Sequence, residues 1–333
     1  MRSSLPARYG LALLLFLAAG MSAAAAPLDA GVLAVRLYAS GPPPRWLDDG
    51  QSQARLALQI LADAAAHGLD PRHYGVDALA RRLDGLQGDA GGFERDLSTA
   101  MLQFLSDLHA GRTRSPYRQA EAPAGLDLVE HLRSAVNGGS LPHAVDAAAP
   151  ALPLYRRVKE TLARYRELAR LAPQWPVLPP AGPAGIVAGA PYAGAALLHQ
   201  RLQLLGDLAS DAAIEDDGIY GSVLADAVRR FQSRHGLAED GMLGAASIAA
   251  LSVAPGRRAE QLALTMERLR WLPPLSGRTI TVNVPAYRLW AFDPRERAAA
   301  QVLEMRVIVG NAAKTPTPLF IGTMRYLEFN PYW

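Results

Sequence analysis

The stretch SVLADAVRRFQSRHGLAEDGMLGAASIAAL, residues 222–251, decides how the centre of this chain folds. Its first half has apolar side chains at helical spacing, which predicts a helix whose buried face is formed by Leu224, Ala227, Val228 and Phe231. Gly236 follows the last helical residue, as is typical of a helix end. The pair Asp240-Gly241 then predicts a turn, after which a short further helix begins.

Another helix precedes this stretch, because residues 197–208, LLHQRLQLLGDL, have helical apolar spacing and Gly206 near their end. We therefore predict a compact unit of three short helices over residues 195–255. Ahead of it, residues 173–194 are punctuated by proline and glycine, which favours a linker or an irregular extended lead-in. These glycines do not fit G-x-G-x-x-G and no strand precedes them, so a phosphate-binding loop is the less favoured interpretation.

The preceding residues, 27–172, have a helical pattern throughout. The segments QSQARLALQILADAAAHGLDP (residues 51–71) and FERDLSTAMLQFLSDLHAG (residues 93–111) each place apolar side chains on one face and end in glycine or proline. A third amphipathic helix, LPLYRRVKETLARYRELARLAP, covers residues 152–173. These segments predict an all-helical domain.

Residues 257–333 change from a brief helix, AEQLALTMERLRWLPP, to a β-rich pattern. Within RTITVNVPAYRLWAFD (residues 278–293) apolar residues alternate at Ile280, Val282 and Val284, which predicts a strand containing them. The segments QVLEMRVIVG (residues 301–310) and GTMRYLEFN (residues 322–330) predict further strands.

The last nine residues, RYLEFNPYW, indicate a strand that runs into a turn, and the predicted sheet still has open edges at that point. We expect Trp271 and Trp290 in the core of this β region. Tyr332 and Trp333 would join them in a complete domain.

The N-terminus has the pattern of an export signal. Arg2 and Arg8 come before the apolar run LALLLFLAAG, and the small residues of MSAAAAP follow it. This predicts a signal peptide over residues 1–26. The apolar run is shorter than the ~20 residues that span a bilayer, and an uncleaved anchor is the alternative. We therefore expect an exported mature chain in a bacterial envelope.

The composition excludes several classes of function. The chain of 333 residues has a net charge of +3, and arginine supplies nearly all of its cations. No dense run of Lys and Arg occurs, which disfavours nucleic-acid binding. The sequence contains no cysteine, so these residues supply no disulfide, thiol nucleophile or thiolate metal ligand.

Residues 195–255 resemble the small three-helix peptidoglycan-binding module. The matching features are the R-L-x-x-L-G opening, the run A-V-x-x-F-Q-x-x-H-G-L, and then D-G-x-x-G before a short final helix. If the resemblance holds, this unit binds stem peptides or muropeptides of the cell wall.

The segments on either side resemble large periplasmic L,D-transpeptidases. MERLRWLPPLSGRTITVNVPAYRLWAFD, MRVIVGNAAKTPTPLF and MRYLEFNPYW are similar to the opening of their catalytic domain, while AHGLDPRHY and SDLHAGRTRSP are similar to their scaffold domain. The resemblance covers nearly the whole mature chain in the same domain order. It implies a multidomain fold with an all-α scaffold domain (residues 27–172), the peptidoglycan-binding domain, and an incomplete mainly-β catalytic domain (residues 257–333). It also implies a location in the periplasm of a Gram-negative bacterium.

In that family, a cysteine in an S-H-G-C type motif attacks a stem peptide, expels D-alanine and passes the acyl group to a neighbouring amine. The thiolate form of the cysteine is the nucleophile, which a nearby base or positive charge favours. This sequence has no cysteine, and its last histidine is His235. The resemblance therefore assigns no catalytic residue here, and we expect a chain truncated before the motif, inactive as a transferase, that retains at most peptidoglycan binding.

Two other functions stay open. The chain could be a non-catalytic wall-binding or scaffold protein. A stable, cooperative fold of the residues after Arg257 would favour this interpretation. An amidase or a glycan lyase is a weaker option, because no supporting group of residues is present. No cofactor is expected, and no membrane contact beyond the signal peptide.

The candidate peptidoglycan-binding residues belong to the three-helix unit. Their amide, carboxylate and guanidinium groups suit a ligand rich in amides and carboxyl groups, and the residues are Tyr220, Arg229, Gln232, Arg234 and Asp240. The alternative is that they form helix surface and a turn. Phe231 is expected in the core instead.

Other charged residues have simpler explanations. The loop GRTRSPYR gathers Arg112, Arg114 and Arg118, and a solvated loop is favoured over a carboxylate site. His67 and His73 flank a helix end but form no metal motif, and His67 is expected to be a cation at that end. Isolated Glu94, Glu121 and Glu130 could be proposed as a general acid for glycan cleavage, but the favoured interpretation is that they are surface helix glutamates.

Overall fold

The computed structural model describes residues 29–86, 88–113, 126–212, 218–272, 277–293 and 302–325. These residues form eleven α-helices and two small antiparallel sheets. The expected signal peptide and the C-terminal segment 326–333 lie outside the described residues. In the described part of the chain, no helix has the length and apolar character needed to cross a membrane.

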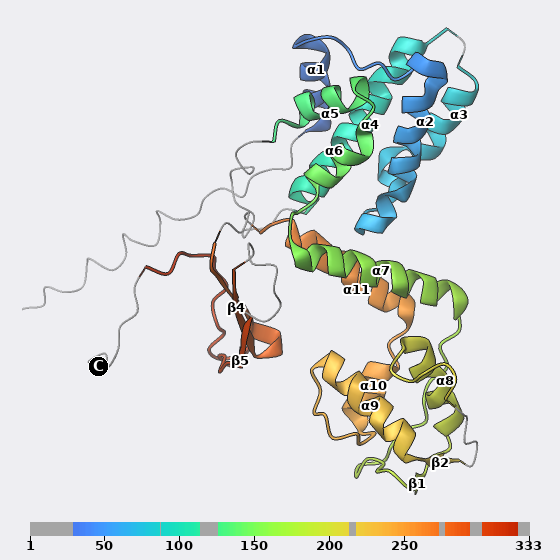
Figure 1. Cartoon of the computed structure of the whole chain (residues 1–333), viewed down its shortest axis with the longest axis vertical. Coiled ribbons are helices and arrows are strands. Elements are labelled where there is room, and N and C mark those ends of the chain that lie inside the picture. The colour runs from blue at the N-terminus through green and yellow to red at the C-terminus, as the bar shows by residue number, and fades with distance from the viewer. Residues whose placement is uncertain are drawn as a thin grey trace, which may run out of the picture.

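The first six helices form a bundle around α4 (Ala90–Ala110), which packs against all five others (Figure 1). These others are α1 (Ala30–Ala39), α2 (Asp48–Ala62), α3 (Val76–Asp84), α5 (Leu128–Asn137) and α6 (Leu141–Ala148). The start of α4 is capped by Asp89, whose carboxylate accepts from the Gly92 N–H. The apolar face that the sequence predicts for this helix is buried, including Phe93, Leu97, Met101, Phe104 and Leu108.

Two short 3-10 helices lie between α2 and α3. They are η1 (Asp63–His67) and η2 (Pro71–Tyr74), and each ends at a glycine in the left-handed conformation. The long helix expected over residues 51–71 therefore changes to a 3-10 helix from Asp63 onward.

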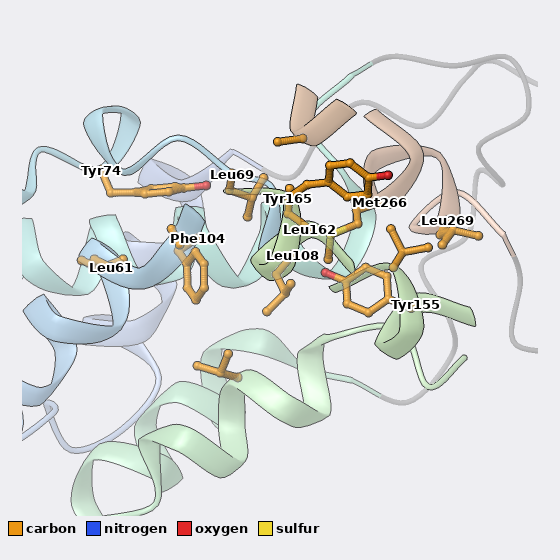
Figure 2. Packing of buried hydrophobic residues seen from close by; sticks show 14 of the residues in the cluster. Leu61, Leu69, Tyr74, Phe104, Leu108, Tyr155, Leu162, Tyr165, Met266 and Leu269 are labelled. Carbon is orange, nitrogen blue, oxygen red and sulfur yellow. The ribbon is translucent and has the colours of Figure 1, made fainter. Parts of the chain in front are cut away.

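A pair of antiparallel helices connects the bundle to the rest of the molecule. Helix α7 (Pro153–Leu171) leaves the bundle and α11 (Pro255–Leu269) returns beside it (Figure 1). Their directions are opposite, because Tyr155 near the start of α7 bonds Arg270 just after α11. Figure 2 shows their shared apolar interior, in which the labelled side chains are Tyr155, Leu162, Tyr165, Met266 and Leu269. The helix that precedes the β region in sequence therefore packs on α7.

The unit between these two helices contains α8 (Ala195–Leu205), α9 (Ser222–His235) and α10 (Ala245–Leu251). Helix α9 ends at Gly236, whose φ of 66° suits a glycine. The inward residues expected for α9 are all buried. A two-stranded sheet of β1 (Ala190–Pro191) and β2 (Ile219–Tyr220) lies at the end farthest from the bundle (Figure 1).

The proline- and glycine-rich segment 173–194 is folded onto this unit. Leu178 and Tyr192 are buried, and the Tyr192 hydroxyl donates to the Pro179 carbonyl. The Trp175 indole N–H donates to the Leu251 carbonyl at the end of α10. Arg201 of α8 is buried, donates to the same Leu251 carbonyl and stacks on the Trp175 ring. We call residues 174–192 the strap, because they pass over the unit instead of linking it loosely.

The β region forms a three-stranded antiparallel sheet in the order β3 (Thr279–Asn283), β4 (Arg288–Phe292), β5 (Leu303–Arg306). The strand expected to include Val284 ends at Asn283, because Val284–Ala286 form a 3-10 turn around Pro285, which has no N–H for a ladder. The register places only apolar side chains on one face, namely Ile280, Val282, Leu289, Ala291, Leu303 and Met305.

The expected strand over residues 322–330 is absent from residues 322–325, and the remainder lies outside the described residues. Trp290 is half-buried, on the other face of the sheet. The prediction that Trp271 lies in the core of the β region was wrong. Its indole nitrogen would lie 2.9 Å from a Cβ placed on Gly111, so Trp271 contacts the end of α4 in the bundle.

Candidate functional site

The turn at Asp240–Met242 is held from inside by Gln232, a buried residue of α9. The Gln232 side-chain amide donates to Asp240 Oδ1 at 2.9 Å, to the Met242 carbonyl at 3.0 Å and to Ser247 Oγ at 3.1 Å. Its carbonyl oxygen accepts from the Gly241 N–H at 2.9 Å. One side chain therefore bonds all three residues of the turn.

Tyr220 supports the same turn from the other side. It lies on β2, is fully buried, and donates its hydroxyl to the Gly241 carbonyl at 2.7 Å. Burial raises the pKa of Tyr220 above its usual value, so the hydroxyl remains a donor at neutral pH. Tyr220 thus joins the two-stranded sheet to the turn.

Arg229 and Asp240 are the exposed members of this group. Asp240 accepts from the Met242 N–H at 2.8 Å, and this bond, followed by the one from Gln232, lowers its pKa. Arg229 pairs with Asp226 one turn earlier on α9. It lies over Gly241, because a Cβ placed there would be 2.8 Å from Arg229 Nε. A cation and a carboxylate therefore flank one turn whose interior is rigidly bonded.

Arg234, the fifth candidate, lies elsewhere. Its guanidinium makes two bonds to the buried Asp207 carboxylate, at 2.8 and 2.6 Å, and these bonds raise its pKa. Helical geometry explains the separation, since Arg229 and Gln232 are three residues apart and share a face, whereas Arg234 is two residues beyond Gln232. The structure thus brings together four of the five candidates.

The strap adds residues to this site that the sequence does not indicate. Ile186 bridges to Leu243, and the Gly189 N–H donates to the Tyr220 carbonyl at 2.8 Å. Gly185 lies against Met242, whose sulfur would be 3.0 Å from a Cβ placed on that glycine. The only sequence signal for this packing is the set of large apolar residues among the prolines, such as Trp175 and Tyr192.

His67 is buried, and the prediction that it is a helix-terminal cation was wrong. Its Nδ1 lies 3.2 Å from the Tyr155 hydroxyl, and its Nε2 lies 2.9 Å from Lys159 Nζ. Burial, helped by the charges of Lys159 and Arg270, lowers the pKa of His67 to about 3. The ring is therefore neutral at pH 7 and accepts from the lysine.

The other candidates remain separate from one another. His73 is exposed and lies 2.7 Å from Arg112, while Glu130 pairs with Arg133. Burial raises the pKa of the half-buried Glu94. Among the described residues, no group of three or more His, Asp or Glu side chains could hold a metal ion. Residues Arg114, Arg118 and Glu121 lie outside the described part of the chain.

Two family models match the chain. Residues 33–162 match the model described as "Scaffold domain" and residues 193–251 match the one described as "Putative peptidoglycan binding domain". No curated protein matches the chain. The second match covers α8, α9 and α10 together with the turn at Asp240, and supports binding to the cell wall. The two matches together fit a scaffold and peptidoglycan-binding protein like an L,D-transpeptidase.

Proposed function

We propose that this chain is an exported, wall-binding, L,D-transpeptidase-like protein, and that it binds peptidoglycan through the unit formed by α8, α9 and α10. The observation that carries this proposal is the match of residues 193–251 to a peptidoglycan-binding domain, over a unit whose helices bury their apolar faces. The preceding match to a scaffold domain and the order of the two agree with it.

Within this unit, the surface around the Asp240 turn is the proposed contact with stem peptides or muropeptides. Arg229 and Asp240 are exposed there and can pair with ligand carboxylates and amides. Tyr220 and Gln232 hold the turn in place, and Arg234 fixes α9 to the segment at Asp207. We assign the first two residues to ligand contact and the other three to support of the site.

Sedimentation with purified peptidoglycan sacculi tests the proposal. We expect the full chain to pellet with sacculi and Arg229→Ala to bind about tenfold more weakly, since a hydrogen bond to a charged group contributes ~1.5–3 kcal/mol. Arg257→Ala is the matched control, because Arg257 is also exposed and pairs with a carboxylate three residues away. A wild-type chain that stays in the supernatant would refute the proposed function.

The transferase chemistry of such proteins requires a cysteine thiolate, and this sequence has no cysteine. We therefore propose that these 333 residues bind the wall without forming an acyl-enzyme. Intact-mass spectrometry after incubation with a carbapenem tests this directly. An unchanged mass is expected, and a covalent adduct of the drug would contradict the proposal.

A non-catalytic scaffold protein is the second candidate function. The antiparallel pair of α7 and α11 favours it, since the pair joins the wall-binding unit to the bundle through a continuous apolar interior. Hydrogen exchange over β3, β4 and β5 separates the two candidates. Cooperative protection of that sheet in the isolated chain would favour the scaffold protein, because a three-stranded sheet with an exposed apolar face is expected to open readily.

The proposed location is the periplasm of a Gram-negative bacterium. It rests on the peptidoglycan-binding match and on the predicted signal peptide. Fractionation of cells that express the chain with a C-terminal tag would test it. Recovery in the cytoplasm with residues 1–26 still attached would contradict the proposed export.

A further inference from the structure

The end of α11 is bonded into the bundle by a buried carboxylate. Glu267 Oε1 accepts from the Arg112 N–H at 2.7 Å, from the Thr113 N–H at 2.8 Å and from Thr113 Oγ1 at 3.0 Å. Its second oxygen accepts from Arg270 at 3.0 Å. A residue at the end of α11 thus holds the backbone that follows α4, which lies more than a hundred residues earlier in the chain.

Arg270 extends this contact to two further elements. Its side chain is fully buried and donates to the His67 carbonyl at the end of η1 and to the Tyr155 hydroxyl on α7, the latter at 3.1 Å. Burial alone would raise the pKa of Glu267. The Thr113 N–H and the Arg270 charge outweigh that effect, so the pKa lies below its usual value and the pair is ionised at neutral pH.

Two glycines bring the backbones close enough for these bonds. A Cβ on Gly68 would lie 3.0 Å from Ala263 Cα, and one on Gly111 would lie 2.7 Å from Glu267 Oε1. Both glycines have a positive φ, 74° and 77° respectively, which other residues rarely adopt. Glycine at both positions therefore allows α11 to pack this closely against the bundle.

We propose that Glu267 and Arg270 form a latch that locks α11 into the bundle, so that the bundle and the wall-binding unit behave as one rigid body. The unit is held at the far end of α7, which is about 28 Å long at ~1.5 Å per residue. Removal of one partner of a buried ion pair leaves the other uncompensated, so loss of the carboxylate should release the end of the helix.

Amide exchange in the full chain is the first test, because the latch holds two identifiable N–H groups. In Glu267→Ala we expect exchange at Arg112 and Thr113 to be at least about tenfold faster, as loss of a charged hydrogen-bond acceptor predicts. Glu260→Ala is the matched control, since Glu260 lies on the same helix and pairs with an arginine three residues away, but is exposed. If Glu267→Ala does not fold, Glu267→Gln is measured, with a smaller increase at the same amides.

Distance measurement in the full chain tests the rigid-body claim. The sequence has no cysteine, so Ala78→Cys on α3 and Ala249→Cys on α10 provide two unique, exposed positions for spin labels. We expect a single narrow distance distribution, which Glu267→Gln broadens and Glu260→Gln leaves unchanged. A broad distribution in the parent chain, or equal widths for both variants, would overturn the proposal.

The latch and the proposed function can fail separately. Sacculus binding reports the surface near Arg229, whereas exchange and spin-label distances report the contact of α11 with the bundle. A chain that binds sacculi but has a broad distance distribution would refute the latch alone. A narrow distribution without sacculus binding would refute the proposed function alone.

Discussion

Replacement of Gln232 by leucine separates support of the Asp240 turn from direct contact with peptidoglycan. Leucine is apolar and suits a buried position, but it makes none of the four hydrogen bonds of the amide. If Gln232 holds the turn, Gln232→Leu should destabilise the unit and weaken wall binding together.

The structure allows an estimate of the size of this effect. Gly241 is buried, so its N–H loses the side-chain acceptor at 2.9 Å and gains no water in exchange. The Met242 carbonyl keeps the Gly244 N–H as a donor at 3.0 Å, and the exposed Asp240 carboxylate can turn to water. A buried polar group left without a partner costs ~1–3 kcal/mol, so loss of the acceptor for the Gly241 N–H should cost the unit about 2 kcal/mol of stability.

Native-state hydrogen exchange of the α9 amides measures this loss in the full chain, because these amides report opening of the unit. A loss of about 2 kcal/mol corresponds to roughly thirtyfold faster exchange. Gln200→Leu is the control, since Gln200 lies in the same unit but is exposed, and it should stay within about 0.5 kcal/mol of the parent. Sacculus binding is measured on the same samples.

One result would refute the reasoning. If Gln232→Leu kept the stability of the parent within about 0.5 kcal/mol and still lost sacculus binding, the amide would contact the ligand directly. The turn would then be stable without Gln232, and the four hydrogen bonds would not be what fixes it.

Three further predictions concern the bundle, and denaturant unfolding of the full chain measures each one. Gly68→Ala should cost at least about 1 kcal/mol more than Gly75→Ala, since both glycines have a positive φ but only at Gly68 would the added Cβ lie 3.0 Å from the α11 backbone; equal costs would contradict this close approach. Burial holds the pKa of His67 near 3, so below pH 6.5 the unfolded chain binds a proton that the folded chain does not. Between pH 7 and pH 5 the free energy of unfolding of the parent should therefore fall by about 2 kcal/mol more than that of His67→Gln. His143→Gln, at an exposed position, is the control and should behave as the parent. Ser98→Ala removes the acceptor of a buried tryptophan N–H at 2.7 Å and should cost ~1–3 kcal/mol, whereas a loss below about 0.5 kcal/mol would show that the indole finds another partner.

The helices of the bundle and of the wall-binding unit were predictable because each has a periodic apolar face and a glycine or proline at its end. Residues 222–235 are the clearest case, since the inward residues named from the sequence are those that are buried. The break between α2 and η1 was not predictable, because Asp63–His67 consist mainly of alanine, which fits either helix type. The end of β3 was predictable in principle from Pro285, which cannot donate to a ladder.

The candidate site was predicted in part. Arg229 and Gln232 meet the Asp240 turn because helical spacing puts them on one face, and this spacing is visible in the sequence. The buried Asp207 that binds Arg234 lies 27 residues earlier, and no local pattern indicates that pairing. The packing of the strap was missed for a different reason, since proline and glycine indicate the absence of regular structure but not the absence of tertiary contacts.

Helix α11 packs with a domain other than the one that follows it in the sequence. From the sequence, the helix before the β region belongs with the strands that follow it. In the structure its apolar face is covered by α7, and its polar end is neutralised inside the bundle by partners from three separate elements. The segments AHGLDPRHY, SDLHAGRTRSP and MERLRW, which lie far apart in sequence, supply the His67 carbonyl, the Arg112 and Thr113 amides, and the Glu267–Arg270 pair of this one junction. Because a buried ion pair stabilises only in its complete arrangement, the same contact that holds α11 should also disfavour other placements of the wall-binding unit.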